Sequence, residues 1–71
     1  MSQEDVLDVL ESRRGRWLTI KDIKAGLRSA GKSASVISGA SDDVYKLVTF
    51  GLIEVKGVGL WRHYNLFKMP L

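Results

Sequence analysis

Apolar residues recur at helical spacing in three segments of the first fifty residues and alternate with polar residues near the C-terminal end. In the first segment, Val6, Val9 and Leu10 fall on one face of a helix that we expect from Ser2 to about Ser12. Gly15 then interrupts the pattern and is expected to end the segment.

A second helix is predicted directly after Thr19. Thr19 and Asp22 have the spacing of a capping box, in which each side chain accepts a hydrogen bond from the backbone of the other residue. Gly31 is expected to end this helix, since glycine readily adopts the left-handed conformation that follows a helix. Residues 17–19 favour a short strand, with Trp17 in the core. The apolar stripe of the second helix consists of Ile20, Ile23, Leu27 and Ala30.

A third helix is predicted from Ser35 to Phe50, with Gly51 at its end. Gly39 within it weakens the helix, because glycine in a helix interior costs roughly 1 kcal/mol relative to alanine. Ser41 can act as a fresh N-cap, so a kink or a restart near Ser41 is the alternative. The positions expected to face inward are Val36, Ile37, Ala40, Val44, Leu47 and Val48.

Two strands are predicted at about 52–57 and 60–67, joined by a turn at residues 57–59. They follow the third helix directly, so they form a C-terminal hairpin. The order of elements predicts an α+β fold with a three-helix core and a β-hairpin wing, in one domain over residues 1–71.

The register of the hairpin depends on the length of its turn. A two-residue turn would place Ile53 opposite Tyr64 and gather the apolar strand residues on one face. A three-residue turn with Gly59 in the left-handed conformation would place Leu52 opposite Tyr64 instead. Val58 fits a tight hairpin turn poorly, so both registers remain open.

Charge is distributed unevenly, although the net charge is only +3. Residues 1–11 contain four acidic residues and no basic one, whereas residues 12–35 contain seven basic residues and one acidic residue. Lys21, Lys24 and Arg28 recur at helical offsets next to the apolar stripe of the second helix. They therefore form a basic stripe that is suited to a polyanion.

Several classes of function are not expected from this composition. The chain has no cysteine and one histidine, which excludes disulfides, thiolate chemistry and the usual zinc sites. His63 has no neighbouring residue that would make it a catalytic base. No apolar run reaches the roughly 20 residues needed to cross a bilayer. We therefore expect a cytoplasmic, non-enzymatic protein without cofactor, metal or membrane association.

The segment from Gly26 to Ser33 matches the phosphate-binding motif G-x-x-x-x-G-K-[ST] in full. That motif cradles phosphates only where it leaves a buried strand and opens a helix. Here Gly26 lies inside a capped amphipathic helix, and the chain is too short for the required parallel sheet. We interpret the segment as the end of a helix and its turn.

Four segments, in this order and spacing, together resemble a winged helix-turn-helix domain of small bacterial and archaeal transcription regulators of the MarR and ArsR kind. They are Leu18–Ile23 at the start of the second helix, Ala30–Ser33 at the turn, Leu47–Ile53 at the end of the third helix and Arg62–Leu66 on the returning strand. The resemblance implies that the third helix enters the major groove of double-stranded DNA, the second helix crosses the backbone and the wing lies along the minor groove or the phosphates.

The resemblance also assigns candidate DNA contacts. Phosphate contacts would come from Lys21, Lys24, Arg28 and Lys32, and from Lys56 and Arg62 of the wing. The outward positions of the third helix would be Ser35, Ser38, Asp42, Tyr45, Lys46 and Thr49. Base reading would therefore depend mainly on hydroxyl groups, which discriminate less sharply than arginine pairs with guanine.

A winged helix that binds a protein is the alternative function. Asp42 and Asp43, expected at a solvated helix start, would repel phosphates, and the predicted reading face has no arginine. In that case the third helix and Trp61, on the outer face of the wing, would contact the partner, and the alternative is that Trp61 folds back over the hairpin. Trp61, Val58 or Leu60 would support a weak homodimer.

Overall fold

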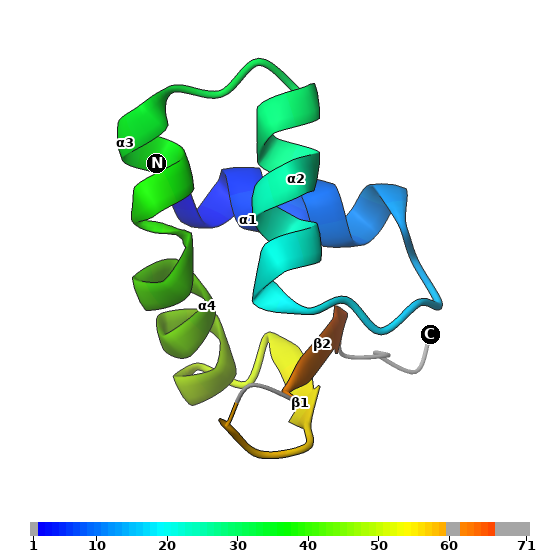
Figure 1. The fold of residues 1–71 in the computed structure, drawn as a ribbon. Coiled ribbons are helices and arrows are strands. Elements are labelled where there is room, and N and C mark those ends of the chain that lie inside the picture. The colour runs from blue at the N-terminus through cyan, green and yellow to red at the C-terminus, as the bar shows by residue number, and fades with distance from the viewer. Residues whose placement is uncertain (1, 60–61, 67–71) are drawn as a thin grey trace.

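The computed structural model describes residues 2–59 and 62–66, which form four helices and a two-stranded antiparallel sheet (Figure 1). The helices are α1 (Ser2–Ser12), α2 (Ile20–Ser29), α3 (Ala34–Ser38) and α4 (Ala40–Thr49), and the strands are β1 (Ile53–Lys56) and β2 (His63–Leu66). The predicted α+β class is confirmed, and the layout is compatible with a winged helix. The first two helices have the predicted bounds.

Local hydrogen bonds set the ends of α2. The Thr19 hydroxyl accepts from the Asp22 backbone N–H at 3.1 Å, and the Thr19 N–H donates to Asp22 Oδ2 at 3.1 Å. These two bonds form the predicted capping box. The Thr19 N–H is the main reason that the pKa of Asp22 lies below its ordinary value. At the other end, Gly31 adopts a φ of +75°, as predicted for the residue that ends the helix.

The predicted third helix is divided at Gly39, so the expectation of one continuous helix is wrong and the alternative of a restart is confirmed. The restart comes slightly before Ser41, because α4 begins at Ala40. Gly39 has a ψ of −1°, which turns the chain away from the axis of α3. A Cβ at this position would lie 3.3 Å from the Ser35 carbonyl oxygen, so glycine suits the close approach.

The hairpin has neither of the two predicted registers. Ile53 pairs with Leu66 and Val55 pairs with Tyr64, so the strands are joined by the longer segment 57–62. A tight primed turn would require a positive φ at Val58, and no described residue other than glycine has a positive φ. The shift from the two-residue turn is an even number of positions, so Ile53 and Tyr64 stay on the predicted buried face.

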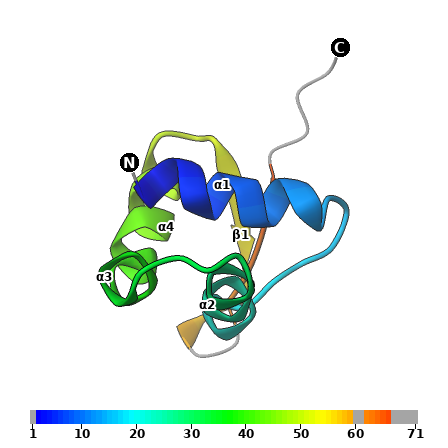
Figure 2. The same cartoon turned by 90° about the horizontal axis from the view of Figure 1, so that it is seen from above.

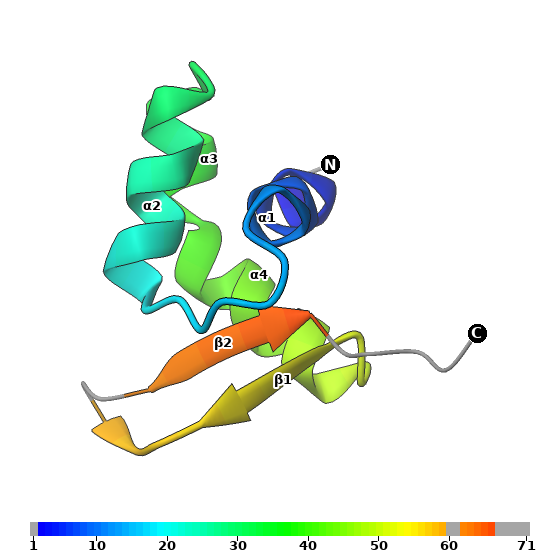
Figure 3. The same ribbon diagram turned by 90° about the vertical axis from the view of Figure 1, so that its right-hand side faces the viewer.

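The described core joins all the helices except α3 to both strands, and α3 packs against it through partly buried residues. α1 lies crosswise to α2 in Figure 1, beside α2 and α4 in Figure 2, and the hairpin lies on one side of the helices in Figure 3. Ala30 is exposed as the C-cap of α2, so its predicted burial is wrong. The buried apolar residues are Val6, Val9, Leu10, Leu18, Ile23, Leu27, Ala40, Val44, Leu47, Ile53 and Tyr64.

The predicted short strand before α2 consists of a bridge between Leu18 and Tyr64. Each backbone N–H donates to the carbonyl of the other residue, at 2.8 Å and 2.7 Å. This bridge attaches the start of α2 to the hairpin. Trp17 is only half-buried and does not belong to the core, which corrects its predicted place. Its ring lies under the Lys56 ammonium group, with Nζ 4.3 Å from the ring centroid.

Candidate nucleic-acid interface

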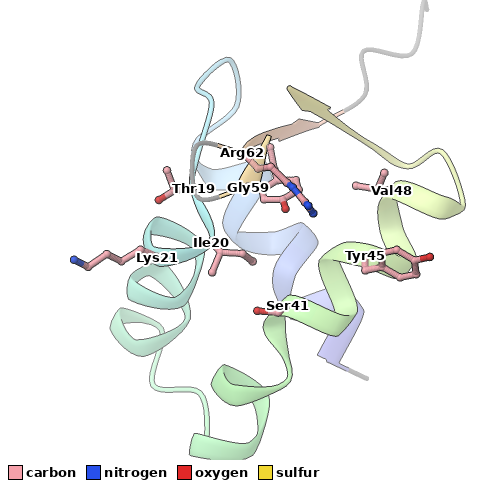
Figure 4. Close-up of a pocket in the computed structure, with 9 residues that line it drawn as sticks. Thr19, Ile20, Lys21, Ser41, Tyr45, Val48, Gly59 and Arg62 are labelled. Atoms are coloured by element: carbon pink, nitrogen blue, oxygen red, sulfur yellow. The ribbon is translucent and has the colours of Figure 1, made fainter. Parts of the chain in front are cut away.

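A groove of about 810 Å³ opens between the start of α2, the outer side of α4 and the segment that joins the strands (Figure 4). Two features position these walls. The capping box sets where α2 begins, and the bridge of Leu18 to Tyr64 holds that start against the hairpin. The residues that line the groove are Thr19, Ile20, Lys21, Ser41, Tyr45, Val48, Gly59, Arg62 and Tyr64.

Three of the residues predicted to contact DNA meet at this groove. Lys21 comes from α2, Tyr45 from α4 and Arg62 from the segment between the strands. Thr19 and Ser41 also line the groove but were not predicted as site residues. Ser41 lies four positions before Tyr45, so helical spacing alone would have placed it beside a predicted residue. Thr19 was recognised only as the N-cap of the helix that carries Lys21.

The two walls of the groove differ in chemistry. Lys21 and Arg62 make the wall of α2 and the strand connection cationic, and Figure 4 shows Arg62 reaching toward α4 while Lys21 extends outward. The α4 wall has no cation among its lining residues. It presents the hydroxyl of Ser41 and the ring of Tyr45, which is 72% exposed. Phosphates are therefore favoured on the α2 side.

The basic stripe of α2 continues away from the groove. Lys21 and Arg28 are exposed and Lys24 is half-buried, whereas Ile23 and Leu27 of the same helix are fully buried. The cationic and apolar sides of α2 are thus separate, as predicted. Within residues 2–59 and 62–66, none of the three cations forms an ion pair with the protein's own carboxylates.

Two other predicted phosphate contacts are engaged within the protein. Lys32 Nζ lies 3.0 Å from Asp5 Oδ1, which connects the turn after α2 to α1. The hydrogen bond from Lys32 to the Asp5 carboxylate raises the pKa of Lys32 above its ordinary value. Lys56 belongs to β1 of the wing, and its ammonium group lies over the ring of Trp17. Both cations are consequently less available to a polyanion than those of α2.

All six residues predicted on the outward side of the third helix are exposed, but several of their hydroxyl groups have local partners. Ser38 Oγ donates to the Ser35 carbonyl at 3.2 Å, and Thr49 Oγ1 donates to the Tyr45 carbonyl at 2.9 Å. Ser35 Oγ lies 3.1 Å from Ser33 Oγ. These hydroxyls would have to exchange partners in order to donate to a base, whereas the Lys46 ammonium group has three N–H donors.

The sequence predicted that Asp43 lies at a solvated helix start, but the structure buries it. It is only 6% exposed, and its Oδ2 atom has no hydrogen-bond partner in the structure. Asp42 beside it is exposed. Of the two carboxylates expected to repel phosphates, only Asp42 therefore faces outward.

Among the described residues, no three His, Cys, Asp or Glu side chains gather closely enough to hold a metal ion. Gly26 is buried inside α2, in agreement with its interpretation as part of a helix. Within the same residues, no helix has the length and apolar character that a bilayer span requires. Trp61, predicted as a partner contact, and Leu60 lie outside the described residues.

Comparisons of the chain with known protein families, with curated proteins and with solved structures found no match.

Proposed function

We propose that this chain is a non-enzymatic DNA-binding module of the winged-helix kind that acts in transcription regulation. The observation that carries the proposal is the basic stripe of Lys21, Lys24 and Arg28 on the side of α2 away from its buried residues, together with the groove that Lys21 lines with Arg62. Lysine and arginine side chains on one face release counterions from DNA when they neutralise its phosphates. In this arrangement α2 lies along the backbone, α3 and α4 face the bases and the wing contacts phosphates.

The first turn of α2 supports this orientation. Lys21 stands in that turn at the rim of the groove, where its ammonium group can contact a phosphate. The bridge of Leu18 to Tyr64 couples this turn to the wing. Phosphates that contact Lys21 and Arg62 would therefore meet surfaces with a fixed separation.

Fluorescence anisotropy with a labelled DNA duplex, repeated over a series of salt concentrations, tests the proposal. We expect binding that weakens steeply with salt, and a slope that falls by about one for each of Lys21, Lys24 and Arg28 that is changed to alanine. Arg14→Ala is the matched control. Arg14 is exposed in the turn after α1, but its guanidinium forms an ion pair with Glu11 at 2.8 Å. Binding that does not respond to salt, or that Arg14→Ala weakens as much as Lys24→Ala, would contradict the proposal.

A protein-binding winged helix is the second candidate, and exposed apolar side chains favour it. Phe50 is 65% exposed, Leu52 is 50% exposed and Val58 is 78% exposed. Apolar side chains that remain in solvent can mark a protein interface. Sedimentation of the chain at increasing concentration tests self-association, and a Phe50→Ser, Leu52→Ser variant should lose it if these residues form the contact.

A further inference from the structure

The shape and the lining of the groove differ from those of a surface that enters the major groove of a duplex. A helix that enters a major groove presents a convex surface, and it meets a phosphate backbone on both sides. Here the lining is concave, its two cations come from α2 and the segment between the strands and none comes from α4, and Ile20 of α2 and Val48 of α4 contribute apolar surface. Asp42, exposed beside the α4 wall, would repel a second phosphate backbone on that side.

Tyr45 gives the α4 wall a large aromatic surface. Its ring is 72% exposed and lies at the rim of the groove, with its hydroxyl directed away from α2 (Figure 4). Proteins that bind single-stranded nucleic acids combine exposed aromatic side chains with cations. A base stacks on the aromatic ring, and the backbone follows the positive charge. The cations come from α2 and the segment between the strands and the ring comes from α4, so the backbone and the base of such a strand would contact different elements.

We propose that the groove binds an unpaired nucleobase, and that the preferred ligand is therefore single-stranded DNA or a single-stranded segment beside a duplex. The phosphates lie against Lys21 and Arg62, and the base lies toward α4, with one face on Tyr45. Ser41 is the hydroxyl on the α4 wall that can bond a base edge. This inference rests on the proposed DNA binding and names the form of DNA that the module takes.

The test compares a labelled single-stranded oligonucleotide with a blunt duplex of the same sequence, by anisotropy at one salt concentration. We expect the single strand to bind the unmodified chain more tightly than the duplex. Tyr45→Ala should weaken binding of the single strand by about 5- to 150-fold, which is the usual effect of losing one stacked base, and should weaken duplex binding clearly less. Tyr45→Phe keeps the ring and should restore most of the affinity.

Phe50→Ala is the matched control, because Phe50 is an aromatic residue of similar exposure, 65%, that does not line the groove. It should leave single-strand affinity unchanged. An oligonucleotide with one abasic position gives a second readout that needs no variant. Scanning this position along a strand that only just spans the groove should reveal one site where loss of the base weakens binding and where Tyr45→Ala has no further effect.

The outcomes separate this inference from the proposed function. One outcome is salt-dependent binding in which the duplex is bound as tightly as the single strand, and in which Tyr45→Ala and Phe50→Ala have the same affinity for the single strand. This outcome would overturn the inference and leave DNA binding in place. No salt-dependent binding of either form would overturn the proposed function and the inference with it. Both variants are at exposed positions, and thermal unfolding followed by circular dichroism would verify that they fold.

Discussion

Gly26 of α2 lies directly against Val9 of α1, so closely that a Cβ at position 26 would be 2.7 Å from Val9 Cγ1. Real atoms do not approach so closely without a shift of one partner. Val9 is buried and β-branched, and its χ1 is restricted in a helix, so it cannot easily move away. This contact sets how closely α1 and α2 approach.

Gly26→Ala should therefore destabilise the protein, although alanine is the better helix former. The forced separation of the helices costs about 1–3 kcal/mol, against a gain of about 1 kcal/mol in helix propensity. Urea unfolding measures the difference. In a Val9→Ala background the same change should cost less or become stabilising, because the clashing methyl groups are gone. Equal costs in the two backgrounds would contradict the account.

Removal of the capping box should weaken α2. Thr19→Ala loses the bond to the Asp22 N–H and should cost about 0.5–2 kcal/mol of stability. This N-cap also fixes the first turn of α2, which carries Lys21. DNA affinity should therefore fall together with stability in Thr19→Ala. Thr19→Ser keeps the oxygen and is the control. Chemical unfolding and anisotropy on the same samples would show whether the two losses occur together.

The capping box also predicts a dependence of stability on pH. The pKa of Asp22 lies below its ordinary value in the folded state, so the folded protein binds its proton less readily than the unfolded chain. The resulting stabilisation is present above the unfolded pKa, which is about 4, and is lost as the pH falls through the folded pKa. Asp22→Asn should reduce stability at neutral pH and flatten the fall in stability below about pH 4. An unchanged slope in this range would contradict the role of Asp22.

The pair between Asp5 and Lys32 should compete with DNA for the lysine. Asp5→Asn removes the carboxylate that lies 3.0 Å from Lys32 Nζ, and so exposes one more free cation beside α2. We expect stronger DNA binding and a salt slope steeper by about one. Asp8→Asn removes a neighbouring negative charge of α1 without breaking this ion pair and serves as the control. If Asp5→Asn had no greater effect than Asp8→Asn, Lys32 would not contact phosphates.

Replacement of Asp43 by an apolar residue should raise the stability of the protein. Its buried Oδ2 atom has no hydrogen-bond partner, and an unsatisfied polar group costs about 1–3 kcal/mol when it leaves water. Asp43→Ala should therefore raise stability by about 1 kcal/mol, after allowance for the lost carboxylate near the start of α4. Asp42→Ala, at the exposed neighbouring position, should lower stability slightly. A loss of stability in Asp43→Ala, measured by urea unfolding, would show that the carboxylate has an essential partner.

The parts of the fold that could be predicted from the sequence depend on interactions between residues close together in the chain. The capping box joins Thr19 and Asp22 across three positions, and Gly31 and Gly51 end their helices because each adopts a positive φ. Apolar periodicity identified the buried sides of α1, α2 and α4, and with them the separate basic stripe of Lys21, Lys24 and Arg28.

The remaining features depend on contacts between residues far apart in the chain, which leave no periodic signal. The hairpin register follows from the conformations available to Val58 and from the buried positions of Ile53 and Tyr64, and periodicity could identify their common face but not their partners. The pairing of Lys32 with Asp5 could not be foreseen either. The groove itself exists because the bridge of Leu18 to Tyr64 holds the wing beside α2 and α4. Local hydrogen bonding and hydrophobic spacing are properties of a short segment, whereas a binding surface arises when several segments pack around one core.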